Sequence, residues 1–225
     1  MCGIYAIFQK TGTLSSAQVH SMAKSAQVRG LDSAGIVFQA DKNISVKKRD
    51  FGSLALIKET VNYRKSRFIA GHSRLVTNDV LNNQPVIKND LIVIHNGIIT
   101  NYLEVWESIG LQPETELDSE LIPALFSHYK NQGLSDDDSI KKIFSVCEGV
   151  VSAILLAPRS NKVYLISNNG SLYYGYKGDS LFIASESFAL TSLQVEEVTQ
   201  VIGLFDFDYV FEFDAIVVDD VVKNN

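Results

Sequence analysis

Short apolar runs, each of strand length, recur along most of the chain. The first covers residues 3–8 and consists of apolar residues rich in β-formers, which predicts a buried strand. Similar runs predict further strands at 35–39, 44–48, 68–75, 90–95, 150–157, 162–167, 171–176 and 180–184, and the tail from 200 to 219 is again typical of strands. Asp41-Lys42-Asn43 and Asn169-Gly170 predict hairpin turns.

Helical periodicity predicts helices between these strands. Apolar residues share one face at 16–28, and further helices are predicted at 51–61, 121–131, 135–146 and, briefly, from 185. Another helix is predicted to open at Ile98, directly after a strand that ends in Asn96-Gly97. Helices grouped between strands, without regular β-α alternation, favour an α+β fold of two sheets covered by helices. No segment resembles a linker, so one domain over residues 1–225 is expected.

Composition narrows the class of protein. With 46% hydrophobic and 20% charged residues, the chain is typical of a globular protein. Its net charge is −6 and its basic residues are scattered, the densest group being Lys47-Lys48-Arg49, so no nucleic-acid surface is expected. No apolar run approaches the roughly 18 residues of a membrane helix, and no membrane contact is expected. The four histidines lack metal-ligand spacing, and we expect neither a metal nor a cofactor.

Cysteine usage points to the cytoplasm and to one reactive position. Cys2 and Cys147 cannot build a disulfide framework, which suits a reducing compartment. Cys147, among apolar residues, is expected to be inert core. If Met1 is removed, Cys2 carries both a thiol nucleophile and an α-amine whose usual pKa is about 7.7–8.0. One residue then supplies nucleophile and base, as in N-terminal nucleophile hydrolases. The alternative is that Cys2 is a small buried residue at the start of a strand.

Several polar residues follow the predicted strands and have two interpretations each. Arg74 either meets an internal acid or binds a ligand carboxylate bidentately. Asn96-Gly97 is either an ordinary turn or a pair of donors for an oxyanion. Asp118 either caps a helix or meets a ligand ammonium. Arg29 and Asp32 either brace their own loop as an ion pair or contact a substrate.

Taken in order, these segments resemble the class II glutamine amidotransferase domains. The resemblance rests on Cys2-Gly3-Ile4, Arg29-Gly30-x-Asp32-Ser33-Ala34-Gly35, Gly71-His72-Ser73-Arg74, His95-Asn96-Gly97-Ile98-Ile99, Asp118-Ser119-Glu120 and Phe182-Ile183-Ala184-Ser185-Glu186. The segment at 95–99 is most similar to the glutaminase domain of glucosamine-6-phosphate synthase. Arg74-Leu75, Asn83-Gln84-Pro85 and Ala184-Ser185-Glu186 are similar, less closely, to that of asparagine synthetase.

The resemblance implies a fold, a reaction and residue roles. The fold would be the four-layer αββα N-terminal nucleophile (Ntn) hydrolase fold, and the reaction would convert L-glutamine to glutamate and ammonia through a Cys2 thioester. Asn96 and the Gly97 N–H would hold the oxyanion, while Arg74 would bind the glutamine α-carboxylate and Asp118 its α-ammonium. The family pattern further places Thr77 near that carboxylate and Arg29 and Asp32 in a supporting loop.

Two departures from the family keep other functions open. Leu75 and Asn78 stand where relatives of the hexosamine synthase type usually have Trp and His, which puts coupling or glutaminase rate in doubt. No acceptor domain is recognised, so a separate ammonia-accepting synthase subunit is expected, or else the chain is part of a longer protein. The alternatives are a catalytically impaired regulatory or binding subunit, and an Ntn amidohydrolase that acts on another amide.

Overall fold

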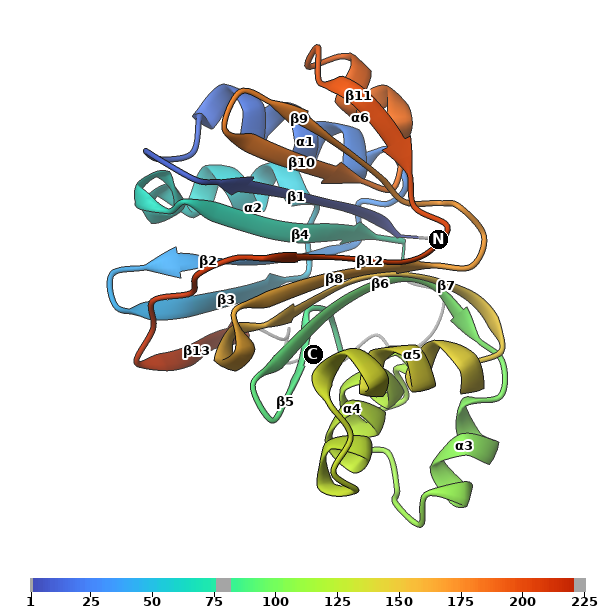
Figure 1. Cartoon of the computed structure of the whole chain (residues 1–225). Coiled ribbons are helices and arrows are strands. Elements are labelled where there is room, and N and C mark those ends of the chain that lie inside the picture. The colour runs from blue at the N-terminus through green and yellow to red at the C-terminus, as the bar shows by residue number, and fades with distance from the viewer. Residues whose placement is uncertain (1, 76–81, 221–225) are drawn as a thin grey trace.

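The computed structural model describes residues 2–75 and 82–220 of the 225-residue chain. Within these residues the strands form two sheets that face each other, and helices cover the outer face of each sheet (Figure 1). The layers therefore run helices, sheet, sheet, helices. The predicted architecture of two mainly antiparallel sheets flanked by helices is confirmed.

The two sheets divide the strands unequally among the described residues. The larger sheet has the order β11-β9-β10-β1-β4-β2-β3-β13, with β1 near its centre, and the smaller has the order β12-β8-β7-β6-β5. The larger comprises β1 (Gly3–Gln9), β2 (Ser33–Ala40), β3 (Asn43–Arg49), β4 (Phe68–Arg74), β9 (Tyr173–Lys177), β10 (Ser180–Ala184), β11 (Glu196–Gln200) and β13 (Ala215–Asp220). The smaller comprises β5 (Val86–Lys88), β6 (Leu91–Ile99), β7 (Gly149–Ala157), β8 (Lys162–Ser167) and β12 (Gly203–Asp208).

Helices close the apolar outer faces. The larger sheet is covered by α1 (Ser16–Gln27), α2 (Ser53–Glu59) and α6 (Ser187–Thr191), and the smaller by α3 (Tyr102–Ser108), α4 (Leu121–Asn131) and α5 (Asp136–Val146). Single 3-10 turns add η1 (Val61–Lys65), η2 (Asp118–Glu120) and η3 (Pro158–Ser160). Figure 1 shows α3, α4 and α5 grouped below the smaller sheet, and α1, α2 and α6 beside the strands of the larger sheet in the upper part of the view.

Alternation along β1 explains why residues 3–8 are continuously apolar. Ile4 and Phe8 point into the core between the two sheets, whereas Tyr5 and Ile7 point into the core beneath α1 and α2. Both faces of the strand are thus buried, and neither face tolerates polar side chains. This double burial holds β1, and with it the adjoining Cys2, at the centre of the molecule.

Two local predictions are wrong, and both concern Asn-Gly pairs. The strand before Asn96-Gly97 does not end there, because β6 continues to Ile99 and pairs Gly97 with Val151 and Ile99 with Gly149 of β7. The following helix begins only at Tyr102. Asn169-Gly170 is not a hairpin turn, since it connects β8 of the smaller sheet to β9 of the larger. The hairpin at Asp41-Lys42-Asn43 is confirmed, with the antiparallel β2 and β3 on either side.

The densest basic group is matched by acids within the fold. The final strand, β13, joins the sheet edge by parallel pairing with β3. Arg49 Nη2 lies 2.9 Å from Asp219 Oδ2, and Lys48 Nζ lies 3.3 Å from Asp220 Oδ2. The Arg49 guanidinium holds the pKa of Asp219 below its usual value. These cations therefore fasten β13 and do not form a basic stripe on the surface.

Candidate active site

Cys2 directly precedes β1, at the end of the larger sheet where β4 finishes. Gly3 pairs with Ser73, one residue before Arg74. A Cβ on Gly3 would lie 2.1 Å from Ala26 O, so only glycine allows α1 to approach this closely. Ser185 fixes the other side, since Ile4 N donates to Ser185 Oγ at 3.1 Å and Ser185 N donates to Ile4 O at 3.0 Å. The chain around Cys2 is thereby held by three neighbouring elements.

A hydrogen bond from the Cys2 backbone links the two sheets. Cys2 N donates to Asn96 Oδ1 at 3.0 Å, which ties the start of β1 to β6 of the smaller sheet. Since this bond engages the amide oxygen, the donor Nδ2 of Asn96 is left to serve other groups. The nitrogen that would act as base after loss of Met1 is thus already placed beside the predicted oxyanion residue.

Burial raises the pKa of the half-buried Cys2 thiol above its ordinary value. The guanidinium of Arg74 and, more weakly, that of Arg29 oppose this rise, whereas the carboxylate of Asp118 adds to it. These effects bring Cys2, Arg74, Arg29 and Asp118 into one electrostatic environment. A thiol with a raised pKa is largely protonated near neutral pH, so nucleophilic attack by it requires a nearby base.

Gly97 follows Asn96 on β6 and has a backbone conformation that favours glycine. Its φ is +155°, and a Cβ there would lie 1.8 Å from Val150 O of the neighbouring strand. Any side chain would therefore force β6 and β7 apart at this point. Strand β6 stays paired with β7 at Asn96 and Gly97, the two residues predicted to hold an oxyanion. The close approach of β7 fixes their position.

Arg74 ends β4 and is only 5% exposed. Its Nη1 donates to Asn82 O at 2.9 Å, and its backbone pairs with Ser33 of β2. A Cβ on Gly30 would lie 2.2 Å from the Arg74 carbonyl carbon, so Gly30 is required for the loop to pack against this strand end. Leu75, the next residue, is half exposed.

Asp118 lies in the 3-10 turn η2, and its carboxylate is anchored to β6. Ile99 N donates to Asp118 Oδ2 at 2.7 Å. The interpretation as a simple helix cap is wrong, because α4 begins after Glu120 and has no side-chain cap. The bond to Ile99 brings Asp118 to the end of the strand that carries Asn96.

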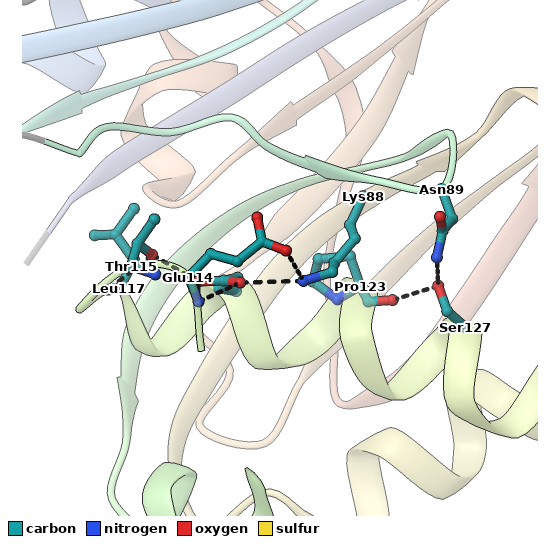
Figure 2. Close-up of polar contacts among 8 residues, drawn as sticks. Lys88, Asn89, Glu114, Thr115, Leu117, Pro123 and Ser127 are labelled. Atoms are coloured by element: carbon teal, nitrogen blue, oxygen red, sulfur yellow. Dashed lines mark hydrogen bonds and ion pairs between the residues drawn. The ribbon is translucent and has the colours of Figure 1, made fainter. Parts of the chain in front are cut away.

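Glu120 clamps the outer side of the same turn. Its buried carboxylate accepts hydrogen bonds from Glu114 N at 3.1 Å, Thr115 N at 2.8 Å and Thr115 Oγ1 at 2.8 Å. Lys88 Nζ forms an ion pair with Glu120 Oε1 at 3.2 Å. Figure 2 shows the Lys88 side chain extending from β5 toward Glu114. Burial alone would raise the pKa of Glu120, but these bonds hold it below its usual value.

The Arg29 loop is braced by a partner from outside the loop. Arg29 Nε donates to Glu186 Oε1 at 2.5 Å, and the two side chains form an ion pair. Arg29 therefore forms its ion pair with Glu186, from outside the predicted loop. Asp32 is exposed, and its backbone N–H donates to Arg74 O at 3.0 Å. The loop supports Arg74 through its backbone, while the Arg29 guanidinium influences Cys2.

Thr77 and Asn78 lie outside the described residues, as does Met1. Of the other predicted site residues, the structure gathers Cys2, Arg74, Asn96-Gly97 and Asp118 at one end of both sheets. Sequence reasoning used Gln84 only within Asn83-Gln84-Pro85, as part of the family resemblance, and assigned it no role of its own. No local signal identifies it, because a polar residue before a proline is ordinary in a loop.

A hollow lies at the opposite end of β6. It has a volume of about 430 Å³ and is lined in part by Asp90, Lys130, Asp136 and Arg159. These charges neutralise each other, because Arg159 pairs with Asp90 and Lys130 with Asp136. Among residues 2–75 and 82–220 there is no cluster of three or more His, Cys, Asp or Glu that could hold a metal. In the same ranges no helix is long and apolar enough to cross a membrane.

Comparison with known proteins identifies the family. Residues 72–192, more than half of the chain, match the model of the glutamine amidotransferase domain. The chain belongs to this family. The glutamine amidotransferase domain is of class II, as the resemblance implied, and its four-layer architecture is the Ntn fold.

Curated relatives of this glutamine amidotransferase domain are much longer proteins. Glutamine–fructose-6-phosphate aminotransferase (isomerizing) from Bartonella quintana is 29% identical over 85% of this chain and 33% of its own length. The protein of the same name from Bacillus thuringiensis is 31% identical over 82% of this chain and 31% of its own length. The chain thus spans about a third of the length of these relatives.

Solved structures agree in fold. The glutamine phosphoribosylpyrophosphate amidotransferase from B. subtilis, complexed with ADP and GMP, superposes with a TM-score of 0.73 at 21% identity. The match covers 96% of this chain and 51% of that one. A glutamine aminotransferase class-II domain protein from Silicibacter pomeroyi covers 93% of this chain with a TM-score of 0.56 at 12% identity. At these identities the likeness speaks for the fold alone.

Proposed function

We propose that residues 1–225 form one glutaminase unit that hydrolyses L-glutamine to glutamate and ammonia and supplies the ammonia to a separate acceptor protein. The observation that carries this proposal is the hydrogen bond from Cys2 N to Asn96 Oδ1, formed in the electrostatic environment of Arg74 and Asp118. Free thiols at both cysteines suit a reducing compartment such as the cytoplasm.

In the proposed reaction the α-amine of Cys2, freed by removal of Met1, takes the thiol proton, and Sγ bonds to the side-chain carbonyl carbon of glutamine. The resulting oxyanion accepts hydrogen bonds from Asn96 Nδ2 and Gly97 N. The carbon–nitrogen bond then breaks, the amine returns the proton to the leaving nitrogen, and ammonia departs. Water attacks the thioester, glutamate leaves, and the thiol is regenerated.

Arg74 and Asp118 suit the two charges of a free α-amino acid. The guanidinium fork matches the α-carboxylate bidentately, and the Asp118 carboxylate attracts the α-ammonium. Thr77 is assigned to the carboxylate as well, on the family pattern. An N-acylated amide lacks the ammonium, so this pair favours glutamine over other amide substrates.

A partner protein is proposed because ammonia released into water is protonated and lost to the acceptor reaction. Exposed apolar side chains occur in the segments around the Cys2 end of the sheets and would suit such a partner. They are Val28, Leu31, Leu75, Ile98, Val150 and Phe188.

Cys2→Ala tests the proposal, with Cys147→Ala as the matched control. Cys147 is buried, and burial raises the pKa of its thiol to about 12, so it has no part in the chemistry. We expect glutamate release to vanish in Cys2→Ala and to persist in Cys147→Ala, with both variants folded. Mass spectrometry of the active protein must find Cys2 as the first residue. Full activity with Met1 retained would exclude the α-amine as base.

The exposed Leu75 favours the alternative of an impaired regulatory or binding subunit, because it stands where relatives of the hexosamine synthase type usually have Trp. A chloroketone analogue of glutamine separates the two functions. An adduct at Cys2 supports catalysis, whereas no adduct on a chain that begins at Cys2 supports the regulatory module. Turnover of an N-acylated amide in preference to glutamine would support the other amidohydrolase.

A further inference from the structure

Gln84 is a buried polar side chain that the proposed reaction does not use. It is 4% exposed and precedes Pro85 and strand β5. In the β5–β6 pairing, Val86 lies opposite Val93, so the same register places Gln84 opposite His95. The Pro85 ring has no N–H and cannot continue a backbone ladder. At this point the Gln84 side chain takes over the pairing.

Both atoms of the Gln84 amide bond the backbone of one residue. His95 N donates to Gln84 Oε1 at 2.6 Å, and Gln84 Nε2 donates to His95 O at 3.0 Å. The side chain thus pairs with His95 as a neighbouring strand would. His95 is followed directly by Asn96, so the amide fixes the backbone immediately before the residue proposed to hold the oxyanion.

Gln84 also reaches the turn that carries Asp118. Its Nε2 lies 3.3 Å from Ser119 Oγ, which in turn lies 3.0 Å from His95 Nδ1. Burial lowers the pKa of His95, so its ring is neutral. His95 Nε2 lies 3.3 Å from Val150 O, which can only accept, so the ring proton is on Nε2 and Nδ1 accepts from the Ser119 hydroxyl. Gln84, His95 and Ser119 therefore form one closed network between Asn96 and Asp118.

The backbone of Gln84 is anchored to the other sheet. His72 Nε2 lies 2.9 Å from Gln84 O, and His72 stands on β4 two residues before Arg74. A Cβ on Gly35 would lie 1.9 Å from the same carbonyl oxygen, so Gly35 is needed to let this segment pass. One residue thus touches both sheets and the turn.

We infer that Gln84 is a positioning residue that sets Asn96 relative to Asp118 and Arg74. This rests on the proposed function, in which Asn96 meets one end of glutamine and Arg74 and Asp118 meet the other. The glutamine side chain can span only a limited range of distances between its amide and its α-carbon, so both ends are productive only when these three residues keep their spacing. Misplacement by about 1 Å is enough to cost on the order of 10²-fold in rate.

Gln84→Met tests the inference because methionine keeps the length of the side chain and removes both polar atoms. The matched control is Gln39→Met. Gln39 lies near the end of β2 that is farther from Arg74, and its Nε2 donates to Asp41 O at 3.0 Å and to Glu212 O. Both variants are assayed well below their unfolding midpoints. We expect kcat for glutamine to fall roughly 10- to 100-fold in Gln84→Met and to stay within about twofold in Gln39→Met.

Gln84→Glu adds a readout that a purely structural role would not move. The ionised carboxylate still accepts from His95 N but cannot donate to His95 O or Ser119, whereas the protonated carboxyl can. Burial raises a carboxyl pKa, which brings this titration toward neutral pH. We expect kcat of Gln84→Glu, relative to the wild type, to recover as pH falls, and the ratio for Gln84→Met to stay flat.

The outcomes separate the two proposals. A wild-type chain that begins at Cys2 and does not hydrolyse glutamine overturns the proposed function. An active wild type with Gln84→Met no slower than Gln39→Met overturns the role of Gln84. If Gln84→Met does not fold, Gln84→Glu decides alone, and a pH-independent activity ratio in that variant contradicts the inference.

Discussion

Asn96→Asp is the sharpest single test of the proposed oxyanion site. The substitution keeps the shape of the side chain and keeps an oxygen 3.0 Å from Cys2 N, but it replaces the donor Nδ2 with a second acceptor. It also introduces a negative charge beside the place where the thiolate and the oxyanion form. Packing should change little, because Asn96 is buried within a paired strand of unchanged backbone.

Two effects set the magnitude. Loss of one oxyanion donor typically costs ~10²–10³ in kcat. Two like charges about 4 Å apart repel by about 4 kcal/mol at an effective dielectric constant near 20, which adds to that loss. The carboxylate would in addition stabilise the protonated α-amine and raise its pKa, so less free base is present at neutral pH. We expect kcat to fall at least ~10³-fold and the remaining activity to shift to higher pH.

Glutamate release, measured across pH with a coupled dehydrogenase, provides the assay. Asn161→Asp is the control, since it makes the same chemical change at a distant hairpin and keeps the oxygen that accepts from Phe211 N at 2.9 Å. The control should match the wild type within about twofold. An Asn96→Asp enzyme that kept more than about a tenth of the wild-type kcat would refute the oxyanion role.

Two further predictions concern the supports of the site. Glu120→Gln loosens the turn that carries Asp118, so it should raise KM for glutamine roughly tenfold, the equivalent of ~1.4 kcal/mol, with kcat nearly unchanged. The control is Glu114→Gln, at the exposed partner of Lys88. Steady-state kinetics in which both variants behaved alike would contradict this prediction. Burial lowers the pKa of His72 from 6.5, its value in the unfolded chain, to about 4. The unfolded chain therefore binds this proton first as the pH falls, and the folded state loses stability below pH 6.5. Through this group the free energy of unfolding should fall by roughly 2.5 kcal/mol between pH 7.5 and 4.5. Urea unfolding at the two pH values measures the loss, and His72→Gln should show a correspondingly smaller one.

Much of the fold was predictable because strand burial leaves a strong local pattern. Residues 3–8 are apolar throughout because β1 has cores on both faces. The errors arose where long-range pairing overrides local signals. Asn169-Gly170 has turn chemistry, but whether the next strand stays in the same sheet depends on β9 pairing with β10, which no local pattern encodes. Likewise, β6 continues through Gly97 only because β7 lies alongside it.

Sequence reasoning identified those site residues whose charge or backbone geometry requires a specific partner in a folded protein. Arg74 at a strand end signalled a carboxylate, and the structure indeed buries it beside Cys2. Gln84 gave no such signal, because an uncharged amide before a proline is ordinary in a loop. Its importance comes from the opposing His95 backbone, and that juxtaposition exists only in the folded chain.

The departures at Leu75 and Asn78 bear on coupling more than on the proposed chemistry. Strand β4 ends at Arg74, and its end packs closely against Gly30. This contact is made with the backbone and does not involve the Leu75 side chain. The Leu75 side chain is half exposed, whereas Arg74 is buried. A change at 75 therefore alters the surface that an acceptor protein would meet and leaves the Arg74 anchorage intact. We infer that Leu75→Trp would change the stimulation of glutamine hydrolysis by an acceptor far more than the basal rate, and a larger change in the basal rate would contradict this division.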